Sequence, residues 1–234
     1  MTSELTFPAP TEPFTVAMLL FPGFTLLDLI GPHQVLIGSA KVHLVAKTPA
    51  PVTSDSGVQL VPTCALEDCP RDVDVLFVPG GMGTFAAMQD AELLAFLADR
   101  GARAGHVTSV CTGSLILAAA GLLAGYRAAT HWSTYDVLAA LGVEGAHERV
   151  VVDRNRVSGG GVTAGIDFGL TLLARLRGEQ VAKLTQLLLE YGPTPPFCAG
   201  TPEQAGPELT AQAQALLAGL GRPPQEARAA RAGG

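Results

Sequence analysis

Short apolar runs, each ended by Pro, Gly or a polar cluster, alternate along this chain with stretches of helical spacing. Apart from Thr15, Phe14 to Phe21 is a continuous apolar run that ends at Pro22-Gly23, and Val73 to Val78 runs into Pro79-Gly80-Gly81. Continuously apolar strands are typical of a parallel sheet that is covered on both faces. After these runs, Ala91 to Ala102 has helical spacing, with Leu94, Leu97 and Ala98 on one face. The alternation therefore predicts a sheet with helices on both sides.

The same reading divides the rest of the chain into elements. Further strands are predicted at 42–46, 58–61, 107–110, 149–152 and 155–157, and further helices at about 24–39, 114–123, 164–176, 179–191 and 202–220. No interior linker is long or polar enough to separate two domains. We predict a single-domain α/β three-layer sandwich of flavodoxin-like type with a mostly parallel sheet. An N-terminal arm is expected at 1–13, the domain at 14–200, and a C-terminal helix and flexible tail at 201–234.

Composition excludes several other classes. With 48% hydrophobic and 15% charged residues, the chain is not intrinsically disordered. The net charge of −6 and the lack of a basic stripe indicate that nucleic acid is not a partner. The most apolar run, near 115–124, is far shorter than the ~18 residues of a membrane span. The start of the chain is polar and Pro-rich with no basic segment, so we expect a cytoplasmic protein with reduced thiols.

The feature with most chemical content is the junction after the strand at 107–110. That strand runs directly into Cys111, Thr112 and Gly113, where a helix begins. A sharp strand-to-helix turn presents a nucleophile at the sheet edge, and it needs small residues such as Ser109 and Gly113 on either side. A helix N-terminus also lowers the pKa of a thiol. The alternative is a buried cysteine that only packs.

Two glycine-rich loops also follow predicted strands. Backbone N–H groups of Gly80 and Gly81, in the loop 79–83, are placed to bind a developing negative charge. The segments 81–86 and 159–164 fit the glycine spacing of a dinucleotide fingerprint. Neither lies in the first strand–helix unit or has a suitable acidic residue ~20 positions later, so no nucleotide cofactor is expected.

Asp28 is a carboxylate flanked by aliphatic residues, which is costly to bury unless it is capped, paired or protonated. One interpretation is an N-cap for a helix starting near Gly31-Pro32. The other is that Asp28 points towards Cys111 with a raised pKa suited to acid–base catalysis. His131 either orients the site or packs structurally, and Trp132 either lines a pocket or packs. No histidine or cysteine has metal-ligand spacing, so no metal is expected.

These motifs together resemble the ThiJ/PfpI superfamily, which is related to class I glutamine amidotransferase domains. The Asp28 turn, Pro79-Gly80-Gly81 and the cysteine turn at Cys111 carry the resemblance. The isocyanide hydratase branch is the most similar, and the segments that indicate it are 27–33, 108–114, 129–132, 147–150, 159–168 and 195–197. Protease-like members place a histidine where Thr112 stands, and deglycase-like members place a glutamate where Asp28 stands. The cysteine turn also resembles sensor domains of AraC-type regulators, but only 44 residues follow Glu190, too few for the DNA-binding part of those proteins.

The resemblance implies an enzyme, a hydro-lyase that adds water to an isocyanide and gives the N-substituted formamide. It implies that Cys111 attacks the terminal carbon, that Asp28 supplies the proton, and that a covalent thioimidate forms. Thr112 would hold Asp28 through its hydroxyl, and the Thr112 and Gly81 N–H groups would face the substrate, beside Gly80, His131 and Trp132. No cofactor is implied, and a homodimer is. The alternatives are another thiol hydrolase or glyoxalase-like enzyme, and a non-enzymatic redox or ligand sensor.

Overall fold

A seven-stranded sheet runs through the centre of the computed structural model, which describes residues 12–220. The strand order is β10-β11-β7-β6-β1-β2-β5, and every neighbouring pair is parallel except β10 and β11. The strands are β1 (Phe14–Leu19), β2 (Ala40–Ala46), β5 (Cys64–Ala65), β6 (Val75–Val78), β7 (His106–Val110), β10 (Val150–Asp153) and β11 (Arg156–Gly159). The predicted mostly parallel α/β sandwich is thereby confirmed.

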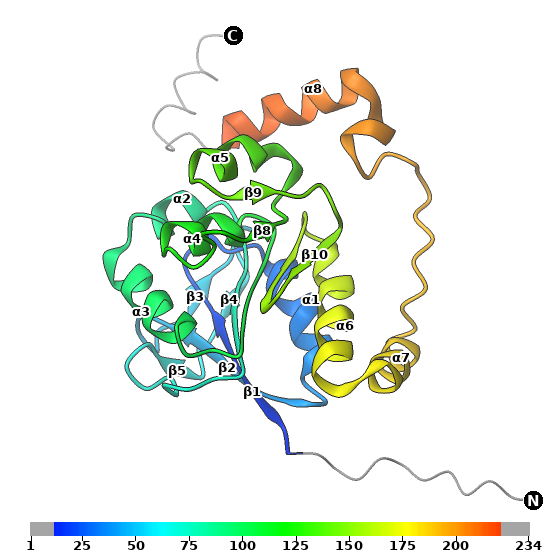
Figure 1. Ribbon diagram of the computed structural model, residues 1–234. Helices are drawn as coiled ribbons and strands as arrows, with labels where there is room; N and C mark the ends of the chain where they lie inside the picture. The colour runs from blue at the N-terminus through cyan, green and yellow to red at the C-terminus, as the bar shows by residue number, and fades with distance from the viewer. Residues whose placement is uncertain (1–11, 221–234) are drawn as a thin grey trace, which may run out of the picture.

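Helices cover both faces of this sheet (Figure 1). On one face lie α1 (Leu26–Leu36), α6 (Ala164–Arg177) and α7 (Glu179–Leu188), and on the other lie α2 (Thr84–Ala87), α3 (Ala91–Gly101) and α4 (Gly113–Ala119). An extended segment leads from α7 to α8 (Pro202–Leu220), which has a non-helical Gly206 and lies above the body of the molecule near α5 (Figure 1). The segment predicted as one helix at 202–220 is therefore helical on both sides of Gly206, where the helix is interrupted.

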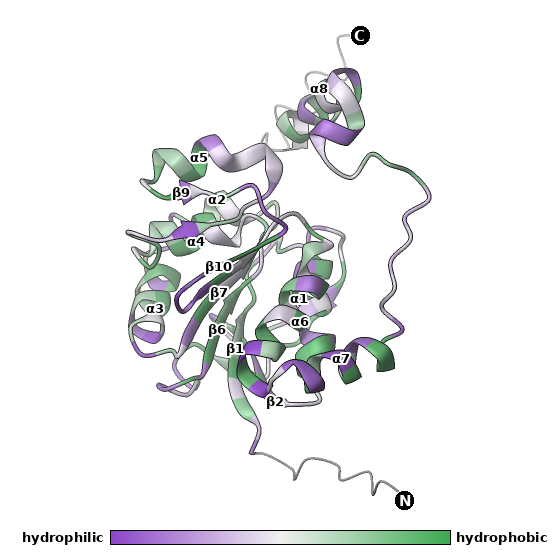
Figure 2. Ribbon diagram, turned by 45° about the vertical axis from the view of Figure 1, so that its right-hand side comes forward, coloured by the Kyte–Doolittle hydropathy of each residue, from purple (hydrophilic) through white to green (hydrophobic). Residues whose placement is uncertain are grey.

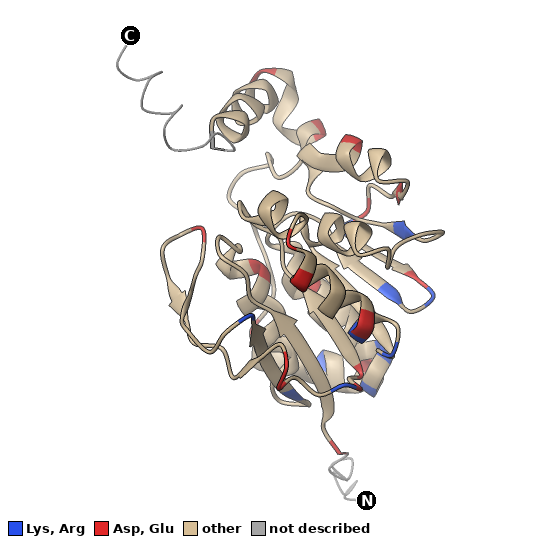
Figure 3. Cartoon of the chain, turned by 90° about the vertical axis from the view of Figure 1, so that its left-hand side faces the viewer, with Lys and Arg blue, Asp and Glu red and all other residues tan. Residues whose placement is uncertain are grey.

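The central strands are apolar because both of their faces are buried. All residues of β6 are buried, as are most of β1, and these strands are green in the hydropathy colouring of Figure 2. Figure 3 shows charged residues on the flanking helices, strand ends and turns rather than along the middle strands. The rings of Phe77 on β6 and Phe168 on α6 lie 5.5 Å apart and join the sheet to its helical layer.

Several short elements were not predicted. Residues 58–61 were expected to form a third strand, but β4 (Gln59–Leu60) instead pairs with β3 (Val52–Thr53) in a separate hairpin, and β5 is the edge strand of the main sheet. A short strand ending at Thr130 was expected, and β8 (Arg127–Ala128) lies there; after it come the unpredicted η1 (Trp132–Thr134), α5 (Tyr135–Ala140) and β9 (Glu144–Gly145). Such short segments carry too few residues for hydrophobic periodicity to show.

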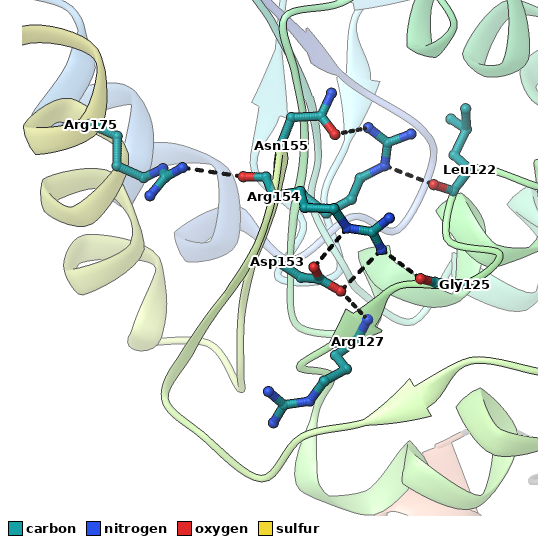
Figure 4. A network of polar contacts seen from close by, with 8 residues as sticks. Leu122, Gly125, Arg127, Asp153, Arg154, Asn155 and Arg175 are labelled. Carbon is teal, nitrogen blue, oxygen red and sulfur yellow. Dashed lines mark hydrogen bonds and ion pairs between the residues drawn. The ribbon is translucent and has the colours of Figure 1, made fainter.

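The turn between β10 and β11 is tied to its neighbours by a polar network (Figure 4). Asp153 accepts hydrogen bonds from the Arg154 side chain and from the Arg127 N–H, both at 2.9 Å. Arg175 of α6 donates to the Arg154 carbonyl at 3.2 Å. Because this turn precedes β11, it lies at the amino ends of the parallel strands, away from Cys111. The network is therefore structural support for the sheet.

Two sequence-based expectations reach beyond the described part of the chain. The arm at 1–13 and the tail at the end of 201–234 include residues 1–11 and 221–234, which are outside the described residues. Between residues 12 and 220, no helix combines the length and apolar character that crossing a membrane requires.

Candidate active site

Cys111 occupies the sharp turn between β7 and α4. Its φ angle is 57°, in the left-handed region that residues other than glycine rarely adopt. The Cys111 N–H donates to the carbonyls of Gly159 and Gly160 at 3.0 and 2.9 Å, and these bonds hold the backbone in place. Strain of this kind concentrates at functional sites. The predicted turn, with an unusual backbone at its tip, is present.

The turn requires a glycine two residues after the cysteine. A Cβ atom on Gly113 would lie 2.2 Å from the carbonyl oxygen of Val78, at the end of the neighbouring strand β6. On the other side, Ser109 is a buried residue of β7. The glycine noted in the sequence after the cysteine therefore has a steric cause.

Asp28 lies in the first turn of α1, and its side chain points away from its own helix. Its Oδ2 accepts a hydrogen bond of 2.9 Å from the Gly80 N–H, in the loop after β6. The N-cap residue of α1 is Thr25, and the helix starts at Leu26 rather than near Gly31. The N-cap interpretation of Asp28 is therefore wrong, because the helix begins earlier than the Gly31-Pro32 signal indicated.

The Asp28 carboxyl is completely buried and in contact with the Cys111 thiol. Burial raises the pKa of Asp28 from 3.8 to about 7, while hydrogen bonds with the Gly80 N–H and the Cys111 side chain oppose that shift. Among the described residues, Asp28 Oδ1 has no partner with ordinary hydrogen-bond geometry, so its contact with the thiol is loosely aligned. Catalytic contacts of this kind often tighten only when substrate binds.

The electrostatics of Cys111 differ from expectation. Burial and the nearby Asp28 carboxylate raise the pKa of the Cys111 thiol well above its ordinary value of 9.0. Hydrogen bonds from the N–H groups of Thr112 and Val162 to the sulfur lower the pKa, but by less. The prediction that this turn lowers the thiol pKa is therefore wrong, because desolvation outweighs the backbone donors. The thiol needs a base to remove its proton, and Asp28 is the carboxylate in contact with it.

The Thr112 hydroxyl does not hold Asp28 as expected. Its Oγ1 accepts from the Gly81 N–H at 3.0 Å and shares a hydrogen bond of 2.7 Å with the Thr84 hydroxyl. Because its N–H is used in this bond, Gly81 is a structural support rather than a free donor. The backbone N–H of Thr112 does face the site, through its bond to the Cys111 sulfur. Gly80 also has a steric role, since a Cβ there would lie 2.5 Å from the Thr112 nitrogen and 3.0 Å from Asp28 Oδ2.

His131 and Trp132 lie on the segment after β8. The His131 Nδ1 accepts a hydrogen bond of 3.4 Å from the Ser133 N–H and so caps the short helix η1, and it also shares a hydrogen bond of 2.7 Å with the Ser133 hydroxyl. Its other edge faces Gly161, where a Cβ would lie 2.8 Å from His131 Cδ2. Trp132 lines a hollow of about 240 Å³ together with the start of α8. Neither side chain makes a described hydrogen bond to Cys111 or Asp28.

Two contributors to the site were missed. Val162 donates its backbone N–H to the Cys111 sulfur, and Thr84 bonds to Thr112. The run Gly159-Gly160-Gly161 was a usable signal, since it places backbone close to Cys111. Across residues 12–220, no cluster of three or more His, Cys, Asp or Glu side chains is arranged to hold a metal ion.

The fold is a mostly parallel, flavodoxin-like α/β sandwich. It belongs to the class of such proteins that carry a buried cysteine on a strained strand–helix turn, here beside a carboxyl of raised pKa. Within that class, the chain belongs to the DJ-1/PfpI family, whose sequence model matches residues 14–175. This match confirms the ThiJ/PfpI resemblance.

Individual relatives are more specific. An isonitrile hydratase from Pseudomonas putida is 52% identical over 192 residues, which cover 81% of this chain and 84% of that protein. A ThiJ/PfpI family protein from Pseudomonas syringae has a crystal structure with a TM-score of 0.88 and 48% identity, covering 93% of this chain and 95% of the other. The transcriptional regulator GbdR of Pseudomonas aeruginosa is 30% identical over 79% of this chain, but the match covers only 52% of GbdR.

Proposed function

We propose that this protein is an isocyanide (isonitrile) hydratase, which converts R–NC and water into the N-substituted formamide. The observation that carries the proposal is the buried Cys111–Asp28 pair in a chain 52% identical to the Pseudomonas putida isonitrile hydratase. An isocyanide has a terminal carbon that accepts both a nucleophile and a proton. A thiol and a carboxyl in contact supply both at one place.

In the first half of the reaction, Asp28 takes the proton of the Cys111 thiol. The thiolate then attacks the terminal carbon, and Asp28 returns the same proton to that carbon. The product is a covalent thioimidate, R–N=CH–S–Cys111. The raised pKa of Asp28, about 7, suits both steps at neutral pH because the group gains and loses a proton readily.

In the second half, the ionised Asp28 accepts a proton from water as the water oxygen attacks the same carbon. Asp28 passes that proton to the nitrogen, and as the carbon–sulfur bond breaks it takes up the hydroxyl proton of the adduct, so the formamide leaves and the pair again holds one proton. The thiolate that departs is met by the N–H groups of Thr112 and Val162, which are already directed at the sulfur. The N–H of Gly80 holds Asp28 Oδ2 at 2.9 Å, leaving Oδ1 for the chemistry.

The R group would extend towards His131 and Trp132. Support comes from the edge of His131 against Gly161, next to the donor Val162, and from the mostly apolar hollow that Trp132 lines. Gly81, whose N–H is engaged by Thr112, would shape the wall of the site without binding the substrate.

We further expect a homodimer in the cytoplasm. Apolar side chains are exposed on the surface of the described chain, including Leu27 and Ile30 of α1 and Leu187 and Leu188 of α7. Exposed apolar groups of this kind are often covered by a second subunit. Light scattering during size-exclusion chromatography measures the mass directly, and a monomer at all concentrations would contradict the expectation.

The function is tested by incubating the protein with an alkyl or aryl isocyanide and quantifying the formamide by chromatography. Steady turnover that depends on Cys111 supports a hydratase. Oxidation of Cys111 without any formamide would instead favour the sensor alternative.

A further inference from the structure

A second pair of cysteines lies at the edge of the sheet, apart from the active site. Cys64 is on β5, the edge strand next to β2, and Cys69 is in the turn that follows. Three strands, β6, β1 and β2, separate β5 from the cysteine-bearing turn after β7. The mechanism above uses neither residue.

The turn folds back so that the two thiols meet. The Cys69 N–H donates to the Ala65 carbonyl at 3.1 Å, which closes a single turn of backbone and returns Cys69 towards β5. The two side chains are close enough that each affects the pKa of the other, and the Cys69 thiol also donates to the Pro70 carbonyl at 3.7 Å. Both are free thiols, Cys64 half-buried and Cys69 buried.

Arg100, from the last turn of α3, packs against Cys69 and also forms an ion pair with Asp99. Its guanidinium donates to the Cys69 carbonyl at 3.0 Å and also contacts the Cys69 thiol, and the side chain is 91% buried. A buried cation beside a thiol stabilises the thiolate. Two thiols in contact, one of them reachable from solvent and the other beside a guanidinium, are the parts of a dithiol redox centre.

We propose that Cys64 and Cys69 form a redox-active dithiol that closes to an intramolecular disulfide when the protein reacts with a hydroperoxide. In the first step the Cys64 thiolate attacks one oxygen of hydrogen peroxide, the O–O bond breaks, and water leaves after the departing hydroxide takes up a proton. In the second step the Cys69 thiolate attacks the Cys64 sulfenic acid, the S–S bond forms, and a second water leaves. Two thiols lose two electrons, and one peroxide is reduced to two waters.

The surroundings of the two thiols determine how fast the disulfide forms. Burial raises the pKa of Cys69 to about 11, while the nearby Arg100 guanidinium lowers it by less. Burial also raises the pKa of Cys64, and the negative charge of Asp68 raises it further. Little thiolate is present at neutral pH, so closure is expected to be faster at alkaline pH. The disulfide would close a short loop, so it would constrain the unfolded chain weakly and would stabilise the fold little.

The test uses the full protein, hydrogen peroxide and mass spectrometry. After exposure, free thiols are alkylated with N-ethylmaleimide and the protein is digested with trypsin. Cys64 and Cys69 share the peptide Thr48–Arg71, whereas Cys111 is in Ala104–Arg127 and the exposed Cys198 is in a third peptide. We expect Thr48–Arg71 to appear without maleimide, lighter by two hydrogen atoms, and to regain both alkylation sites after treatment with dithiothreitol.

Two variants make the result decisive. Cys64→Ser should leave Cys69 open to alkylation after the same exposure and should keep the turnover of the reduced protein, and Cys198→Ser should close the disulfide as the wild type does. The proposal is overturned if Thr48–Arg71 still carries two maleimide groups when Cys198 has been oxidised. It is equally overturned if either cysteine pairs with Cys111 or Cys198 instead.

Discussion

The Asp28 carboxyl and the Cys111 thiol lie in contact in the protein interior, and burial raises the pKa of both groups. The pKa of Asp28 is about 7, whereas that of Cys111 is well above 9.0. Near neutral pH the pair therefore holds its last proton on sulfur, and the carboxylate beside it is ready to accept that proton. The helix N-terminus was expected to favour the thiolate by lowering the thiol pKa. In the proposed mechanism the Asp28 carboxylate generates the thiolate instead, because it can both remove the thiol proton and return it to substrate.

Cys111→Ala should abolish turnover, because no other group in the site can form the thioimidate. Cys198→Ala is the matched control, since Cys198 is exposed and should leave turnover unchanged; Cys64→Ala and Cys69→Ala should also retain it. Formamide production by each variant provides the measurement. Turnover by a folded Cys111→Ala protein would show that the reaction does not pass through this thiol.

The pH dependence of kcat/KM should report the Asp28–Cys111 pair. The active form carries one proton shared between the two groups, and below about pH 7 a second proton binds to Asp28. We predict that kcat/KM falls as the pH decreases through about 7, with the apparent pKa belonging to the pair rather than to one residue. A profile that stays flat from about pH 5 to 8 would contradict this protonation scheme.

The free energy of unfolding should also depend on pH because of the raised pKa of Asp28. A carboxyl whose folded-state pKa is raised contributes stability that is fully present below its unfolded pKa, 3.8, and is lost as the pH rises through about 7. The shift corresponds to up to roughly 4 kcal/mol. Cys111 stays protonated throughout this range and does not add to the effect.

Denaturant unfolding of the wild type and Asp28→Asn at several pH values measures this effect. The Asn variant lacks the titrating group. As the pH rises from about 4 to 8, the free energy of unfolding of the wild type should therefore decrease relative to that of the variant. Other titrating groups are common to both proteins and cancel in the difference. A difference that does not vary with pH would mean that Asp28 is not held at a raised pKa.

The cysteine turn should tolerate no side chain at Gly113. Gly113→Ala places a Cβ 2.2 Å from the Val78 carbonyl oxygen, and overpacking of this kind costs about 1–3 kcal/mol or more. Gly38→Ala is the control, because a Cβ there meets nothing within 4 Å. Thermal unfolding should show a clear loss for Gly113→Ala and little change for Gly38→Ala; equal melting temperatures would contradict the steric argument.

Much of the fold was predictable because β1 and β6 are buried on both faces, so their residues are almost all apolar. The cysteine turn was predictable too, since Gly113 is required by the packing against β6. The position of Asp28 was left open, because its partner is a backbone N–H in a distant loop. The direction of the Cys111 pKa was predicted wrongly, since desolvation depends on everything that packs over the turn. The donor at Val162 is its backbone N–H group, so the identity of the residue gives no sign of the contact with Cys111.

The measurement that tests the central claim most directly is the rate of formamide formation from an isocyanide by the wild type and by Asp28→Asn. The substitution keeps the shape of the side chain and an oxygen that can accept from Gly80, but it removes the acid and base. General acid–base catalysis contributes roughly a hundred- to ten-thousand-fold, so turnover should fall by at least about a hundredfold while the variant remains folded. A folded Asp28→Asn protein that forms formamide at close to the wild-type rate would contradict the role of Asp28 and the mechanism that depends on it.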